Sequence, residues 1–145
     1  MSITIIVSAL LAGGFGFFKY KAVKSQDIIP KVGIVNEKLI LCGEKPNCVC
    51  SFNTDEEHKI DAIQTNRSIS EVISKLEKEL SLKIITKNEN YVHFTFTSSI
   101  MGYVDDIEVY QSSGALQVRS ISRVGYSDMG ANRKRIELIR SLLDN

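Results

Sequence analysis

The chain begins with an uninterrupted apolar stretch. Residues Ile3 to Phe18 carry no charge, and Lys19, Tyr20, Lys21 and Lys24 follow them directly. These sixteen residues fall short of the roughly 20 that cross a bilayer, but snorkelling lysines and Tyr20 extend the stretch by a turn. We therefore expect residues 1–24 to be an uncleaved membrane anchor that contacts lipid through residues 3–23. A cleaved signal peptide would need a basic segment ahead of the apolar run.

A second pattern, with apolar residues three and four positions apart, begins at Ile69. It predicts an amphipathic helix of about a dozen residues. Ser68 and Glu71 stand at the spacing of a capping box, in which each satisfies a backbone N–H of the first turn. The apolar positions of this helix are Ile69, Val72, Ile73, Leu76 and Leu80.

Two hairpins are predicted after this helix, because runs rich in β-branched and aromatic residues are separated by short polar turns. The first joins Leu82–Thr86 to Tyr91–Thr97, and the second joins Tyr103–Gln111 to Ala115–Ile121. A two-residue turn at Ser113 and Gly114 is favoured in the second hairpin.

This turn sets the register of the second hairpin. It places Val109 opposite Val118 and Glu108 opposite Arg119, whereas a slip of one residue would turn the apolar set outward. In this register Asp106, Glu108, Arg119 and Arg123 share one face of the hairpin.

The predicted elements together indicate an α+β domain. If His58–Gln64 supplies a first strand and a last helix runs from Asp128 or Ala131 to Leu143, the order is β-α-β-β-β-β-α. Short hairpins imply an antiparallel sheet, here of about four to five strands, with two helices packed on one face and an N-terminal transmembrane helix. Residues 25–40, which lack a sustained period, are predicted as a linker, and residues 41–145 as the soluble domain.

Composition supports a single globular domain with its own core. The chain has 145 residues, 43% of them hydrophobic and 24% charged, and its formal net charge is only +1. A general nucleic-acid partner is therefore not expected, since phosphate binding needs a clear excess of Lys and Arg on one face.

Three cysteines stand close together at Cys42, Cys48 and Cys50. Cys42 and Cys48 can close a small disulfide loop, which would be expected in an oxidising compartment. The lysines after the apolar stretch favour the cytoplasmic side instead, by the positive-inside rule. We expect the extracytoplasmic side without excluding the cytoplasmic one. Three thiols without a fixed fourth ligand make a poor zinc site, so neither a metal nor another cofactor is predicted.

Polar residues are densest between the last strand and the last helix, over residues 119–135. Gly125 and Gly130 permit the backbone conformations of a tight loop there, and Asp128 or Ser127 can cap the helix. The segment reads R-S-x-S-R-x-G-x-S-D-x-G-x-N-R-x-R, preceded by G-Y-V-D-D and earlier by C-G-E-K-P-N-C-V. These motifs resemble the domain-of-unknown-function 1499 family over Leu41 to Leu143. The resemblance implies a small membrane-associated or exported domain and brings no established activity.

The polar segment allows two interpretations. Arg119, Arg123 and Arg133 could form an anion site with the N-terminus of the last helix. Alternatively, neighbouring carboxylates neutralise the arginines in a structural ion-pair network, which is the outcome we expect. The candidate residues for either role are Asp105, Asp106, Arg119, Ser122, Arg123, Asp128, Asn132 and Arg133.

Sequence motifs for catalysis are missing: no nucleophile elbow, P-loop or dinucleotide fingerprint is present. We therefore expect a non-enzymatic, membrane-anchored binding or accessory module that recognises an anionic ligand or a protein at the polar corner. The alternative is a small hydrolase or transferase for an anionic substrate, using Asp105, Asp106, Arg119, Ser122 and Asp128. An enzyme would need these groups to converge on an open pocket, whereas a module can bury them in pairs.

Overall fold

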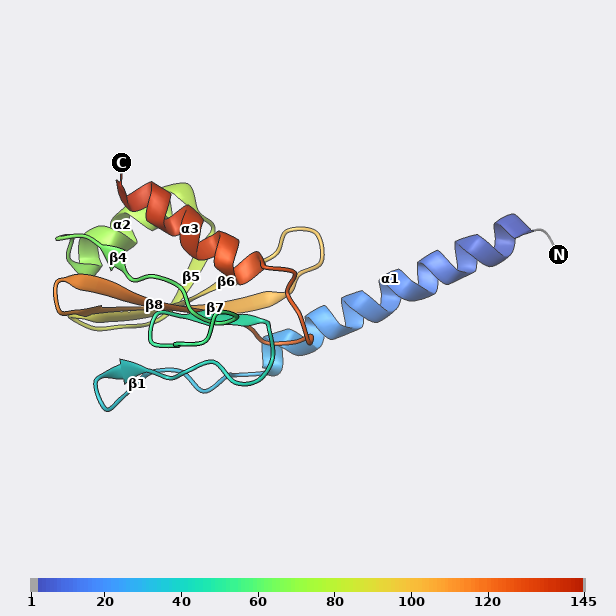
Figure 1. Cartoon of the computed structure of the whole chain (residues 1–145). Helices are drawn as coiled ribbons and strands as arrows, with labels where there is room; N and C mark the ends of the chain where they lie inside the picture. Colours follow the sequence, from blue (N-terminus) through green and yellow to red (C-terminus); the bar gives the residue numbers. More distant parts are fainter. Residues whose placement is uncertain (1–2, 145) are drawn as a thin grey trace.

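The computed structural model describes residues 3–144, with side chains from residue 14 onward. Over this part the chain is an α+β structure with three helices and antiparallel sheets, as predicted (Figure 1). The elements are α1 (Ile3–Asp27), β1 (Ile34–Val35), β2 (Lys38–Leu39), β3 (Cys48–Cys50), β4 (Ile63–Gln64), α2 (Ile69–Glu79), β5 (Leu82–Lys87), β6 (Tyr91–Thr97), β7 (Val104–Ser112), β8 (Ala115–Ser122) and α3 (Ala131–Asp144).

The main sheet has six strands in the order β3-β8-β7-β6-β5, with β4 also paired to β8. Four to five strands were predicted. The difference arises at one edge, where β8 pairs with β3 at Cys48 to Cys50 and with β4 at Ile63 and Gln64. The predicted first strand over His58–Gln64 is shorter than expected, and β3, only three residues long, carried no readable pattern.

The predicted register of the second hairpin is confirmed. Val109 pairs with Val118 and Glu108 with Arg119. The turn residues Ser113 and Gly114 have φ values of 55° and 77°. Two consecutive positive φ values give the backbone twist that two-residue hairpins require.

One face of the sheet is covered by α2 and α3, which lie together above it in Figure 1. The capping box at Ser68 and Glu71 is formed as predicted. Leu76 from α2 and Ile136 from α3 are fully buried against apolar strand residues such as Ile107. This face contains the main hydrophobic core.

The opposite face of the sheet is covered by the chain that follows α1. This N-terminal segment, residues 28–47, runs beneath the sheet and includes the β1–β2 hairpin (Figure 1). Leu39 is 1% exposed and packs with Tyr91, Tyr110 and Cys50 in a second, smaller core. Parts of the segment predicted as a linker, at Gly33 and Leu39, therefore contact the sheet, while the division into anchor, linker and domain stays a prediction.

The transmembrane helix predicted near the N-terminus is not supported. In the part of the chain that the structure describes, no helix is both long enough and apolar enough to cross a membrane.

Candidate ligand pocket and the ion pairs around it

Two ion pairs lie on the face of the sheet away from α2 and α3. Arg119 Nη1 is 2.6 Å from Glu108 Oε2. Arg123 holds Asp106 with two bonds, from Nε at 2.6 Å and from Nη2 at 2.9 Å. All four side chains are at most 9% exposed. They share one face because strand residues alternate, as the register predicted.

Glu108 joins the sheet to the N-terminal segment. Its Oε1 accepts hydrogen bonds from Tyr91 Oη at 2.7 Å and from the backbone N–H of Gly33 at 2.6 Å. Its partner Arg119 also donates to the carbonyl oxygen of Lys31 at 3.1 Å. The pair therefore satisfies backbone groups of a segment that has little regular structure to pair them.

Arg123 joins the same face to α1. Its Nη1 donates to the carbonyl oxygens of Ser25, at 3.3 Å, and Gln26, at 3.1 Å. These belong to the last turn of α1, whose carbonyls lack partners within the helix and attract a positive charge. The buried hydroxyl of Ser25 also accepts a hydrogen bond from the backbone N–H of Val104. The end of α1 is thereby fixed to β7.

Asp106 is shared between Arg123 and His93, whose Nε2 is 2.7 Å from Oδ1. Burial alone would raise the pKa of Asp106, but the hydrogen bonds from His93 and Arg123 outweigh it and hold the pKa below its usual value. His93 is itself buried, so the Asp106–His93 hydrogen bond joins the neighbouring strands β6 and β7 away from solvent.

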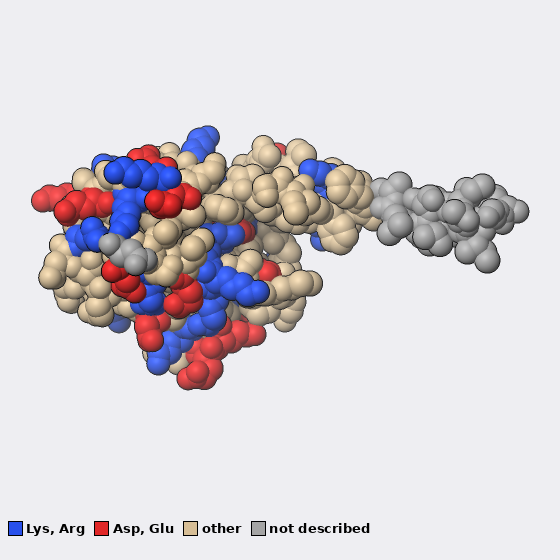
Figure 2. Space-filling view, turned by 90° about the horizontal axis from the view of Figure 1, so that it is seen from above, with Lys and Arg blue, Asp and Glu red and all other residues tan. Residues whose placement is uncertain are grey.

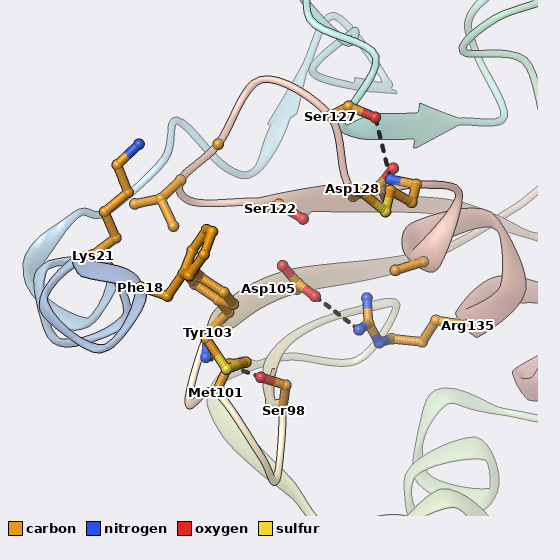
Figure 3. Close-up of a pocket in the computed structure, with 14 residues that line it drawn as sticks. Phe18, Lys21, Ser98, Met101, Tyr103, Asp105, Ser122, Ser127, Asp128 and Arg135 are labelled. Atoms are coloured by element: carbon orange, nitrogen blue, oxygen red, sulfur yellow. Dashed lines mark hydrogen bonds and ion pairs between the residues drawn. The ribbon is translucent and has the colours of Figure 1, made fainter. Parts of the chain in front are cut away.

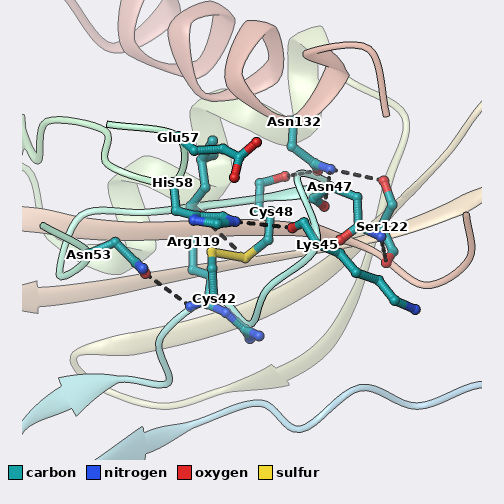
Figure 4. Close-up of a disulfide and its surroundings, with 12 residues drawn as sticks. Cys42, Lys45, Asn47, Cys48, Asn53, Glu57, His58, Arg119, Ser122 and Asn132 are labelled. Carbon is teal, nitrogen blue, oxygen red and sulfur yellow. Dashed lines mark hydrogen bonds between the residues drawn. A yellow bond between two sulfur atoms is a disulfide. The ribbon is translucent and has the colours of Figure 1, made fainter. Parts of the chain in front are cut away.

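Asn132, the second residue of α3, is buried at the centre of another network (Figure 4). Its Nδ2 lies within 2.9 Å of the carbonyl oxygen of Asn47, Ser122 Oγ and Asp128 Oδ2. Its Oδ1 accepts from Ser120 Oγ. The network ties β8, α3 and the chain before β3 together. Asn47 was not predicted, although it stands inside the C-G-E-K-P-N-C-V motif.

Asp128 forms the N-terminal cap of α3. Its two carboxylate oxygens accept from the backbone N–H groups of Gly130, at 2.9 Å, and Asn132, at 2.7 Å. Gly125 and Gly130 have φ values of 93° and 78°, a region that disfavours side chains.

Arg133 lies apart from the other two arginines of the supposed anion site. It projects from α3 on the helix-covered side and donates to the carbonyl oxygens of Glu57 and Lys59. Arg119 and Arg123 lie on the opposite face. The three arginines therefore do not converge on one site.

A pocket of about 480 Å³ opens where the polar segment meets α1 (Figure 3). Its polar side is formed by Asp105, Ser122, Asp128 and Arg135. The apolar side is formed by residues from α1, from the β6–β7 loop and from the loop before α3, namely Phe18, Met101, Tyr103, Val124 and Met129. Three predicted site residues, Asp105, Ser122 and Asp128, therefore meet at one cavity.

Asp105 and Arg135 form an ion pair at the wall of this pocket. Arg135 Nη2 is 2.7 Å from Asp105 Oδ2, and its guanidinium group lies 4.8 Å from the centre of the Phe96 ring. Burial raises the pKa of Asp105, and Arg135 only partly offsets this effect. Arg135 was not among the predicted site residues. The signal that could have found it is its spacing of three from Asn132 on one face of α3.

The predicted disulfide between Cys42 and Cys48 is present (Figure 4). Cys50 is free and buried, and burial raises the pKa of its thiol. His58 is buried between Asp55 Oδ1, at 2.6 Å, and the carbonyl oxygen of Lys45, at 3.1 Å. Among the described residues, no cluster of three or more His, Cys, Asp or Glu side chains could hold a metal ion.

The fold and the pocket define a small α+β domain with an N-terminal helix and a polar strand-to-helix corner. The family model described as "Protein of unknown function (DUF1499)" matches residues 38–143, so the chain belongs to this family. No curated protein and no solved structure matches the chain.

Proposed function

We propose that this chain is a non-enzymatic binding module that takes a small ligand into the pocket beside Asp105. The observation that carries the proposal is the pocket itself, whose volume of about 480 Å³ is in the range of small-molecule sites, roughly 300 to 1,000 Å³. Apolar walls with a few convergent polar groups are typical of such sites. The ligand should accordingly have an apolar body and one polar end.

The charges at the pocket favour a neutral polar end. Arg135 is already paired with Asp105, and Asp128 is occupied as a helix cap. A phosphate would meet Lys21 but also two carboxylates and a neutralised arginine, whereas a hydroxyl or amide can donate to Asp105 and accept from Arg135. We therefore propose a ligand without net charge in place of the anionic ligand expected from the sequence.

The distribution of the paired groups supports a module rather than an enzyme. The alternative hydrolase or transferase would use Asp105, Asp106, Arg119, Ser122 and Asp128 together. Asp106 and Arg119 are buried in ion pairs on the face away from the pocket. Binding through Asp105, Ser122 and Arg135 needs no such convergence.

The test is thermal unfolding of the full chain with 1-decanol, a neutral amphiphile, and separately with inorganic phosphate. Decanol should raise the melting temperature, because a ligand that binds only the native state stabilises it. Phosphate should not. Val124→Trp, which places a large ring on the pocket wall, should remove the decanol effect, while Ile85→Trp on exposed β5 should retain it. An equal rise in both variants would contradict the proposal.

The proposal also puts the soluble domain on the extracytoplasmic side of a membrane. The disulfide between Cys42 and Cys48 supports this location, since such bonds persist in oxidising compartments. Maleimide labelling of the native protein tests it. If Cys42 and Cys48 react without prior reduction, the disulfide and the location both lose their support.

A further inference from the structure

The part of α1 next to the globular body carries four exposed aromatic rings and three lysines. Phe15, Phe17, Phe18 and Tyr20 are between 49% and 59% exposed. Each lysine lies over the ring four residues before it: Lys19 over Phe15 at 5.6 Å, Lys21 over Phe17 at 4.9 Å and Lys24 over Tyr20 at 5.5 Å. We call these seven residues the collar.

The collar surrounds the helix instead of forming one stripe. Successive helical residues turn by about 100°, so rings at positions 15, 17, 18 and 20 point in widely different directions. A groove on a protein partner, or a helix lying flat on a membrane, would call for a one-sided stripe. Rings and lysines on all sides are typical of a helix surrounded by lipid headgroups.

The charge of the collar also suits a membrane surface. Residues 14–26 include three lysines and no acidic residue, and the uncharged stretch Ile3–Phe18 runs into them from the N-terminal side. Lysine ammonium groups attract anionic headgroups, while their stems and the aromatic rings remain among the acyl chains. Figure 2 shows the contrast with the globular body, where acidic and basic side chains are interspersed.

The pocket mouth adjoins the collar. Phe18 and Lys21 belong to the collar and also line the pocket, as Figure 3 shows. Lys19 Nζ donates to the carbonyl oxygen of Ile100, in the loop beside the mouth, at 3.0 Å. Ile100 is 77% exposed, and Met129, which lines the pocket, is 91% exposed. We call Ile100 and Met129 the rim.

Met129 is unusual in both backbone and exposure. Its φ of 53° is a conformation that costs a non-glycine residue energy. The backbone N–H groups of Met129 and Gly130 donate to Ser127 Oγ and Asp128 Oδ1 and hold this turn. The result is a long apolar side chain directed into solvent, where it contributes nothing to the core. Such an exposed apolar group beside an apolar pocket is expected at an interaction surface.

We propose that the collar and the rim form one surface that docks on an anionic lipid bilayer, so that the pocket mouth faces the lipid. Arg123 and Ser25 fix the end of α1 to the sheet, and the collar and rim are therefore held in one arrangement. The statement about the pocket mouth rests on the proposed function. If the mouth faces lipid, the ligand of the pocket is a neutral amphiphile that enters from the membrane.

The chain has no tryptophan, so a single introduced tryptophan reports its own surroundings. Three variants of the full chain, Phe17→Trp, Met129→Trp and Lys87→Trp, are reconstituted in vesicles of phosphatidylcholine and phosphatidylglycerol with brominated acyl chains. Bromine quenches tryptophan that reaches the acyl region. Lys87 is the matched control, since it is exposed and pairs with Val92 near the start of β6, whereas the pocket lies beyond the other end of β6, at Ser98.

We expect strong quenching at positions 17 and 129 and none at position 87. Replacing Lys19, Lys21 and Lys24 together with Gln should reduce the quenching at position 129 and should remove its dependence on phosphatidylglycerol. Unfolding midpoints of all variants verify that each is folded.

Two outcomes overturn the proposal. If position 129 is no better quenched than position 87, the pocket mouth does not face lipid, even if position 17 is quenched. If quenching is the same in pure phosphatidylcholine, the lysines do not recruit an anionic surface. Neither outcome bears on the decanol experiment, which tests separately whether the pocket binds a ligand.

Discussion

The two faces of the main sheet are covered in physically different ways, although the same strands supply both. On β7, Ile107 and Val109 point toward α2 and α3, and the alternating residues Asp106 and Glu108 point toward the N-terminal segment. One face is closed mainly by apolar packing. The other is closed by buried ion pairs and hydrogen bonds beside a smaller apolar cluster.

The reason lies in what covers each face. Helices satisfy most of their own backbone groups, so α2 and α3 can cover the sheet mainly through apolar contact. The N-terminal segment is largely irregular, and its backbone groups would be buried without partners. Glu108 binds the N–H of Gly33, and Arg119 binds the carbonyl of Lys31. Buried charged side chains on a sheet can thus provide hydrogen-bond partners for the backbone of an irregular covering segment, without any role in binding a ligand.

The largest effect should come from breaking an ion pair on the polar face. Arg119→Gln leaves Glu108 buried without its cation, and losing one partner of a buried pair costs about 3 to 5 kcal/mol. Among the described residues Arg119 Nε has no hydrogen-bond partner, so the cost should lie near the lower value. Denaturant unfolding measures it. Glu137→Gln, in an exposed pair with Arg140, is the control and should cost about 1 kcal/mol or less.

A truncation on the apolar face should also destabilise the protein, but the loss involves no charged group. Its effect on the free energy of unfolding should therefore not depend on salt. Leu76→Ala removes a fully buried side chain of α2 and should cost about 2 to 5 kcal/mol through lost burial and a cavity. The unfolding free energy of this variant should keep the salt dependence of the wild type. Arg119→Gln should change that dependence. Equal salt responses would erase the distinction between the faces.

The disulfide should matter mainly to the N-terminal segment. Replacing both Cys42 and Cys48 with Ser releases the chain between β2 and β3 and should cost about 2 kcal/mol, at the low end for disulfides because the loop is short. Hydrogen exchange should rise around Gly33 and Leu39 while α2 stays protected. A uniform rise across both faces would contradict this expectation.

The loop before α3 should be sensitive to single methyl groups. Gly125→Ala and Gly130→Ala place a Cβ at positions with φ of 93° and 78°, and each should cost about 1 kcal/mol or more. Melting temperatures measure this. Gly14→Ala, with open space around its Cβ position in helix α1, is the control and should not lower the melting temperature.

Acid should weaken the polar face before the apolar one. The pKa of Asp106 in the folded protein is held below its usual value. Its stabilising contribution is therefore complete above about pH 3.9, the usual pKa of an aspartate, and is lost as the pH falls through the lower pKa of the folded state. Unfolding free energies of wild type and Asp106→Asn should therefore converge on acidification. Divergence of the two curves would show that Asp106 does not stabilise the native state through its charge.

Elements with a local pattern were predictable from the sequence, and those defined by distant partners were not. The helix at Ile69 and the register at Val109 follow from spacing and turn chemistry. The three-residue strand β3 and the packing of the N-terminal segment depend on β8, about 70 to 90 residues away, and no local periodicity records them. At the site, Asp105, Ser122 and Asp128 were predicted, but the partner Arg135 and the pocket wall from α1 depend on tertiary structure.

The bonds from Arg123 to Ser25 and Gln26 span 98 and 97 residues of sequence. During synthesis α1 therefore leaves the ribosome long before the arginine that holds its last turn. Contacts of such separation form late, because the chain between them must first be ordered. For most of its synthesis α1 would thus be free of the sheet, and its lasting attachment would form only when the last hairpin closes. Arg123→Gln should accordingly speed the release of α1 more than it slows the formation of the rest of the sheet.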